Sequence, residues 1–102
     1  MSAKPWDFIR THGISGGASR RKVAAIAKSM RTSGWKGPPI AVLEYNGQKY
    51  ILDGHHRAMA ARKAEIAVAH RVVDPRELLH FGYHSIDEVI QAAAEAGPVK
   101  LR

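Results

Sequence analysis

A pair of strands that runs directly into a helix constrains the fold of this chain more than any other feature. Residues 40–45 and 48–52 are rich in β-branched, aliphatic and aromatic side chains, so both segments predict strands. Asn46-Gly47 between them is a strong signal for a two-residue hairpin turn. The alanine-rich residues 55–65 follow almost at once and predict a helix. We therefore expect a domain that combines strands with helices.

The rest of the chain adds further helices and one more strand. In order, the pattern predicts a short helix over 5–12, an amphipathic helix over 19–33 with Ser19 as its N-cap, a strand over 68–73, and helices that begin with capping boxes at Asp74 and Ser85. A length of 102 residues suits one domain of modest size.

The excess of positive charge indicates which partners the chain is suited to bind. Sixteen Lys and Arg residues against nine Asp and Glu give a formal net charge of +7. This excess attracts nucleic acid, nucleotides or an acidic protein, and a solvated basic surface is the plain alternative. The chain has no cysteine, which excludes disulfides and redox chemistry at sulfur. No apolar segment reaches the roughly 18 residues of a membrane span, so we expect a soluble protein without membrane contact.

The junction Asp53-Gly54-His55-His56-Arg57 predicts a phosphate site. A glycine between a strand and a helix lets backbone N–H groups approach an anion, and the positive end of the helix dipole lies at the same point. Arg57 gains most in the first helical turn if an anion is bound there. The alternatives are that Gly54 only forms a tight turn and that Arg57 pairs with Glu44 on the surface.

Two side chains of the junction are candidates for catalysis. His55 is a candidate general acid or base, because an imidazole titrates near neutral pH. Asp53 is a candidate Mg²⁺ ligand, or a base that orients an attacking nucleophile. The alternative for Asp53 is a structural cap of the junction, and the alternative for both histidines is a packed or solvated imidazole.

A basic run at the start of the 19–33 helix supports the phosphate hypothesis. Arg20, Arg21 and Lys22 place positive charge where the helix dipole disfavours it, so a bound anion explains the run better than helix stability does. The alternative is a solvated helix start. We interpret the remaining aromatic and histidine side chains as structural or solvated: Trp6, Trp35, His12, His70, His80 and His84.

Over residues 19–74 the order of these segments resembles the ParB N-terminal and sulfiredoxin superfamily. Ser29-Met30, Gly34 and Pro39-Ile40 occupy the places of ParB motifs that precede the junction. The resemblance implies a small α/β (α+β) domain in which flanking helices cover a mixed sheet of a few strands. In this division, residues 1–18 are a lead-in segment and residues 75–102 are C-terminal helices of the same domain.

The sulfiredoxin junction reads Gly-Gly-Cys-His-Arg, and Gly54, His56 and Arg57 match its glycine and its His-Arg pair. The resemblance and the basic run together imply a phosphate-binding set of Gly54, His56, Arg57, Lys22, Arg21, Arg20 and Ser29. His55 stands where sulfiredoxin has its catalytic cysteine, so the chemistry of peroxiredoxin repair is excluded.

The pattern from Ser-Arg-Arg-Lys-Val to Asp-Gly-His-His-Arg is also similar to the ParB-like domain at the C-terminal ends of bacterial polymorphic toxins. That resemblance implies a nuclease-type toxin, carried to a target cell as the tip of a larger secreted protein, active in bacterial cytoplasm and inhibited by an acidic immunity protein. The alternatives are an ATP- or CTP-dependent phosphotransferase or NTPase, and a non-catalytic module that binds nucleic acid. The ligands implied are nucleic acid or a nucleotide such as ATP or CTP, with Mg²⁺ as cofactor.

Overall fold

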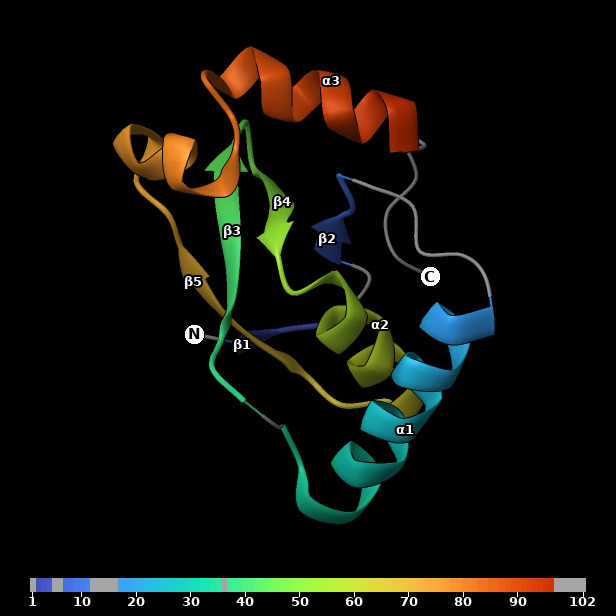
Figure 1. The fold of residues 1–102 in the computed structure, drawn as a ribbon. Coiled ribbons are helices and arrows are strands. Elements are labelled where there is room, and N and C mark those ends of the chain that lie inside the picture. Colours follow the sequence, from blue (N-terminus) through green and yellow to red (C-terminus); the bar gives the residue numbers. More distant parts are fainter. Residues whose placement is uncertain (1, 5–6, 12–16, 36, 97–102) are drawn as a thin grey trace.

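The computed structural model describes residues 2–4, 7–11, 17–35 and 37–96, which form a five-stranded sheet with helices on both faces (Figure 1). In chain order the elements are β1 (Ser2–Ala3), β2 (Phe8–Ile9), α1 (Gly17–Ser33), β3 (Ile40–Tyr45), β4 (Gln48–Asp53), α2 (His55–Ala64), β5 (Val68–Val72), the 3₁₀ helix η2 (Pro75–Phe81) and α3 (Ile86–Ala96). The strands lie in the order β1-β5-β3-β4-β2.

The β3–β4 hairpin is the antiparallel centre of this sheet. Asn46 and Gly47 both have positive φ angles, 51° and 73°, as a tight hairpin turn with the twist of its strands requires. From β4 the chain passes through α2 and enters β5, which pairs in parallel with β3. β2 pairs in parallel with β4, and β1 is antiparallel to β5. The sheet is therefore mixed, and the predicted fold class is confirmed.

Alternating side chains of β3 divide the core into two layers. Ile40 and Val42 pack with α1 and α2 on one face of the sheet, whereas Ala41 and Leu43 pack with η2 and α3 on the other. The helices contribute their apolar stripes to these layers: Val23, Ala27 and Met30 from α1, Ala58, Ala60 and Ala61 from α2, Leu78 from η2 and Val89 from α3. In Figure 1 the two helix pairs accordingly lie on opposite sides of the strands.

The short helix predicted over 5–12 is wrong where the structure describes it. Phe8 and Ile9 form β2, and the side chain of Phe8 is fully buried (0% exposed) in the α1–α2 layer of the core. A helix of only eight residues is marginal by itself, whereas pairing with β4 buries both apolar side chains. The N-terminal residues thus supply two strands of the sheet.

The predicted N-cap of α1 is wrong, whereas the predicted caps Asp74 and Ser85 are confirmed. α1 begins at Gly17, so Ser19 lies inside the helix and is not its N-cap. The segment after Asp74 forms a 3₁₀ helix, in which the Asp74 carboxylate accepts a hydrogen bond from the Arg76 N–H at 2.9 Å. Ser85 is confirmed as a capping residue of α3, because its Oγ accepts a bond from the Glu88 N–H at 3.3 Å. In the part of the chain that is described, no helix combines the length and apolarity that crossing a bilayer requires.

Candidate phosphate-binding site

Gly54 joins β4 to α2 in a conformation that other residues rarely adopt. Its φ angle is 103°, and a Cβ atom at this position would overlap the Ile40 side chain and lie 3.1 Å from Nη2 of Arg57. The side chains of Ile40, from β3, and Arg57, from α2, therefore pack directly against Gly54. A glycine is thus required here both by the positive φ angle and by the two side chains that pack against it.

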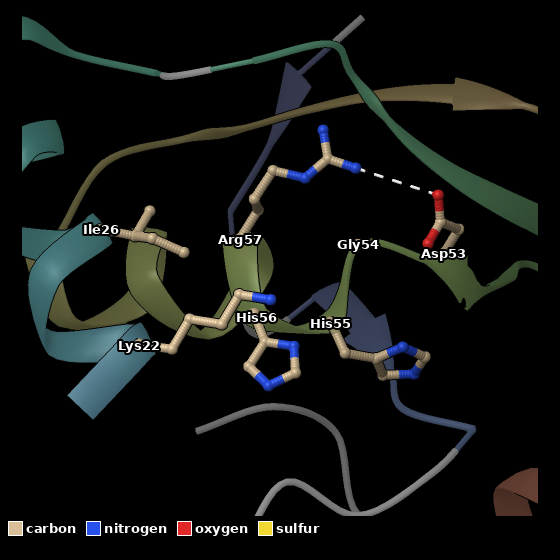
Figure 2. A pocket seen from close by; sticks show the side chains of 7 residues that line it. All are labelled: Lys22, Ile26, Asp53, Gly54, His55, His56 and Arg57. Carbon is tan, nitrogen blue, oxygen red and sulfur yellow. Dashed lines mark ion pairs between the residues drawn. The ribbon is translucent and has the colours of Figure 1, made fainter. Parts of the chain in front are cut away.

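A pocket of about 440 Å³ opens beside this junction (Figure 2). It is lined by Lys22 and Ile26 of α1, Asp53 of β4, Gly54, and His55, His56 and Arg57 of the first turn of α2. The N-cap glycine provides no side-chain hydrogen bond, and the first turn of α2 contains no acidic residue. The partial positive charge of a helix N-terminus is therefore not offset by a capping carboxylate on the helix itself.

Lys22 and His56 bring two more donors to this pocket from different helices. Lys22 is exposed on α1, and Figure 2 shows its side chain extending toward the first turn of α2. His56 is half-buried, and its Nε2 lies 3.4 Å from Oγ of Ser19. Packing of α1 against α2 places these groups together, although they are more than thirty residues apart in sequence.

Arg57 is held by neighbouring groups of the protein rather than by Glu44. Its Nη1 donates a hydrogen bond to the Pro38 carbonyl oxygen, and its Nη2 lies 4.0 Å from Oδ2 of Asp53. Figure 2 shows the guanidinium directed toward Asp53. The Arg57 side chain is 22% exposed and that of Asp53 is 70% exposed, so only the carboxylate is largely open to solvent. Arg57 fastens the segment before β3 to α2 and adds positive charge beside the pocket.

His55 is buried (3% exposed) and fastens the N-terminal segment to α2. Its Nε2 accepts a hydrogen bond from the Thr11 N–H at 3.1 Å, and Oγ1 of Thr11 donates to the Ile51 carbonyl at 2.6 Å. An imidazole nitrogen that accepts a bond carries no proton, so this network assigns the neutral Nδ1–H tautomer. The lone pair of Nε2 that a general base would use is therefore engaged by Thr11.

Three residues of the expected phosphate-binding set do not line the pocket. Arg20, Arg21 and Ser29 are exposed on α1 but lie outside the lining. Conversely, Ile26 lines the pocket, and Thr11 and Ser19 contact its two histidines. Ile26 belongs to the predicted apolar stripe of α1, whereas no local pattern marks Thr11 as a partner of His55. These partners come together only through the packing of separate elements.

Within the described residues, no three His, Asp or Glu side chains come together as a metal site. Among the residues that the structure describes, Asp53 is the one carboxylate that lines the pocket. Mg²⁺ is commonly held by one or two carboxylates together with substrate phosphates. Asp53 could therefore supply one ligand, with the others coming from a bound phosphate chain and water, and Asp53 as an Mg²⁺ ligand stays a prediction.

The other histidines and tryptophans that are described lie away from the pocket. His70 is buried against Phe8 with a ring separation of 5.3 Å, and burial lowers its pKa from the ordinary value of 6.5. His84 pairs with Glu88 at 3.1 Å, and His80 is exposed. Trp35 packs against the α1–α2 layer and donates from Nε1 to the Gly37 carbonyl at 3.0 Å. His12 and Trp6 lie outside the described residues.

Comparison with solved structures finds a similar fold in a chromosome-partitioning protein. The C-terminally truncated ParB from Caulobacter crescentus, crystallised in complex with CTP-gamma-S, superposes with a TM-score of 0.61 at 22% sequence identity. The match covers 80% of this chain and 49% of the ParB chain, so the protein spans about half the length of that relative. No protein-family profile and no curated protein matches the sequence. The predicted resemblance is thus confirmed as a ParB-like fold, while the toxin subgroup stays a prediction.

Proposed function

We propose that the pocket beside Gly54 binds the phosphate groups of a nucleotide. The observation that carries this proposal is the convergence of Lys22 and His56, from two helices, on the N-terminus of α2, which has no side-chain cap. A lysine ammonium, an imidazole and the N–H groups of a first helical turn are all donors that phosphate oxygens accept. The complex of the similar ParB with CTP-gamma-S supports a nucleoside triphosphate as the ligand class.

Electrostatics at the pocket favour a multiply charged ligand. Lys22 and Arg57 are cationic, and Asp53 lies close enough to Arg57 to offset only part of that charge. The volume of about 440 Å³ falls within the range of pockets that bind small ligands. Phosphates placed over Gly54 gain from the helix dipole and from the charge of Lys22 at the same time.

Catalysis is a separate hypothesis, and its candidate residue is Asp53. Its carboxylate is largely exposed at the edge of the pocket, where it could orient water or hold Mg²⁺ beside a phosphate. His55 is better suited to positioning, because Thr11 already occupies its Nε2. The NTPase alternative requires phosphate release from a free nucleotide, and the nuclease-type toxin hypothesis requires cleavage of DNA or RNA. If the pocket performs NTP hydrolysis or nucleic-acid cleavage through Asp53, Asp53→Asn should abolish that activity.

Delivery by a larger carrier and inhibition by an acidic immunity protein belong to the toxin hypothesis. Their support is the similarity of the Asp-Gly-His-His-Arg segment to toxin tips, together with the net charge of +7 that would attract an acidic inhibitor. Action in the bacterial cytoplasm belongs to the same hypothesis, and nucleotide binding at the pocket does not depend on it.

Replacing Lys22 tests the binding proposal. We expect Lys22→Ala to bind CTP, ATP and tripolyphosphate about tenfold more weakly, because a charge-assisted contact contributes roughly 1.5–3 kcal/mol. Isothermal titration calorimetry with and without Mg²⁺ measures this change. The matched control is Lys28→Ala, which removes an exposed lysine from the same helix outside the pocket and keeps the affinity within about twofold.

Two results would contradict the proposal. One is the absence of binding of any of the three ligands to the unaltered protein at millimolar concentration. The other is an equal loss of affinity in Lys22→Ala and Lys28→Ala, because that result would mean that only the net charge of α1 matters.

A further inference from the structure

Thr11 lies outside the lining of the pocket but contacts the chain on both sides of the Gly54 turn. Its backbone N–H donates to Nε2 of His55 at 3.1 Å, and its Oγ1 donates to the carbonyl oxygen of Ile51 at 2.6 Å. Ile51 lies on β4 before the turn, and His55 is the first residue of α2 after it. A single residue therefore joins the strand and the helix that the glycine separates.

The Thr11 hydroxyl supplies a donor where the pairing of β2 with β4 ends. The last paired residues are Ile9 and Tyr50, and Tyr50 immediately precedes Ile51 on β4. Beyond this pair, the Ile51 carbonyl oxygen accepts its bond from the Thr11 side chain. A buried carbonyl group that loses its donor is costly, so this bond matters to the end of β4 that leads into the turn.

The Thr11 contacts are shielded from water. Thr11 is 4% exposed and His55 is 3% exposed, although His55 also lines the pocket. Oγ1 of Thr11 lies 3.3 Å from the same Nε2 atom that accepts from its amide, so both polar groups of Thr11 approach one imidazole nitrogen. Hydrogen bonds in a low-dielectric interior are stronger than in water and fix the groups that they join. The first turn of α2 is thereby held in one orientation against β4.

The orientation of this first turn determines where its N–H groups point. N–H groups at the start of a helix have no intrahelical partner, and they are the donors that a phosphate at a helix N-terminus accepts. In this protein they belong to the residues that line the pocket, from His55 to Arg57. A site that has to be ordered on binding loses affinity relative to one that is already held in place.

We propose that Thr11 is a positioning residue of the phosphate pocket, and that it holds the Gly54 turn in the conformation that binds a nucleotide. The inference rests on the proposed function, because it concerns the same pocket. Thermodynamic linkage makes the effect reciprocal: if the Thr11 contacts favour binding, a bound nucleotide favours the Thr11 contacts by the same factor. Docking of β2 and Thr11 is therefore coupled to occupancy of the pocket.

An isosteric substitution tests the positioning role. Thr11→Val keeps the backbone N–H but removes the hydroxyl, and we expect it to bind CTP, ATP and tripolyphosphate about fivefold more weakly in calorimetry. Thr11→Ser keeps both donors and should stay within about twofold of the unaltered protein. The matched control is Thr32→Val, which removes a hydroxyl that donates to the Lys28 carbonyl oxygen at an exposed position on α1 and should leave the affinity unchanged.

A second control separates positioning from a general loss of stability. Val89→Ala creates a cavity in the η2–α3 layer, on the face of the sheet away from the pocket, and lowers the free energy of unfolding. Measured under conditions in which both variants are folded, it should keep the affinity for CTP within about twofold.

Hydrogen exchange tests the reciprocal effect in the unaltered protein, independently of any substitution. The Thr11 amide exchanges when its bond to His55 opens. We expect saturating CTP to slow this exchange about fivefold, by the linkage argued above. The Gly34 amide, which donates to the Met30 carbonyl oxygen at the far end of α1, is the internal control and should change by less than about twofold.

Four results would overturn the inference while leaving the proposed function intact. They are an unchanged affinity in Thr11→Val, an equal loss in Val89→Ala, a loss in Thr11→Ser as large as in Thr11→Val, and a Thr11 amide whose exchange CTP does not slow more than that of Gly34. If Thr11→Val does not fold, the exchange measurement decides. Absence of binding to the unaltered protein would instead remove the proposed function and this inference together.

Discussion

Individual residues of the junction carry different kinds of constraint. Gly54 is required by its backbone angle and by the Ile40 side chain against it, whereas Lys22 reaches the pocket from another helix and is exposed. Buried His55 links Thr11 to α2, and His56 beside it lines the pocket near Ser19. The two adjacent imidazoles both line the pocket but have different environments: His55 is buried against Thr11, and His56 is half-buried near Ser19.

At the residue scale, Gly54→Ala tests the constraint on the junction. We expect a loss of about 3 kcal/mol in the free energy of unfolding, because the added Cβ combines an unfavourable positive φ with overlap against Ile40. Gly47→Ala is the matched control. It shares the positive φ but meets no atom within 4 Å, so it should cost only about 1 kcal/mol. Equal losses in urea denaturation would show that packing at Gly54 adds nothing.

At the scale of elements, the site depends on segments that are distant in sequence. α1 and α2 pack side by side on one face of the sheet (Figure 1). This packing brings Lys22 to the first turn of α2 (Figure 2). β2 pairs with β4 immediately before the segment in which Thr11 binds His55. β2 and the residues that follow it are thus connected both to the core and to the first turn of α2, which lines the pocket.

Phe8→Ala tests whether β2 is an integral part of the domain. We expect it to lower the free energy of unfolding by about 3–5 kcal/mol, since the ring is fully buried between the sheet and the helices. Phe81→Ala is the comparison, because this half-buried ring on η2 should cost only about 1–2 kcal/mol. A small effect of Phe8→Ala in chemical denaturation would mean that β2 contributes little to stability.

For the whole molecule, the separation of charge and the buried histidine determine how it responds to its solution. α1 and α2 contain basic residues and no Asp or Glu, whereas α3 contains acidic residues and no Lys or Arg. His70 is buried on β5, the strand between β1 and β3, and burial keeps its pKa below 6.5.

The stability of the whole protein should therefore fall in mild acid. Below about pH 6.5 the unfolded chain binds a proton at His70 that the folded protein does not, so the free energy of unfolding decreases as the pH falls toward the lowered pKa. His70→Gln should reduce this slope between about pH 7 and 5, whereas His80→Gln, at an exposed position, should leave it unchanged. Urea titrations at several pH values across this range measure the free energy of unfolding. If its dependence on pH is the same in His70→Gln as in the unaltered protein, His70 is not the source of the acid sensitivity.

The sequence by itself determined those features that depend on neighbouring residues. Asn46-Gly47 predicted the hairpin because its turn needs positive φ angles, and the glycine after β4 predicted the start of α2. The apolar stripe of α1 and the ParB-like order of elements were also readable from the sequence, and both were confirmed.

Only the tertiary structure decided which distant groups meet. It pairs Phe8 and Ile9 with β4 where a short helix was predicted, because long-range burial outweighs the local preference of a short segment. It also gives Arg57 the Pro38 carbonyl and Asp53 as partners, and leaves Ser29 outside the pocket. These contacts depend on the packing of helices against a sheet, and the spacing of residues along one element does not encode them.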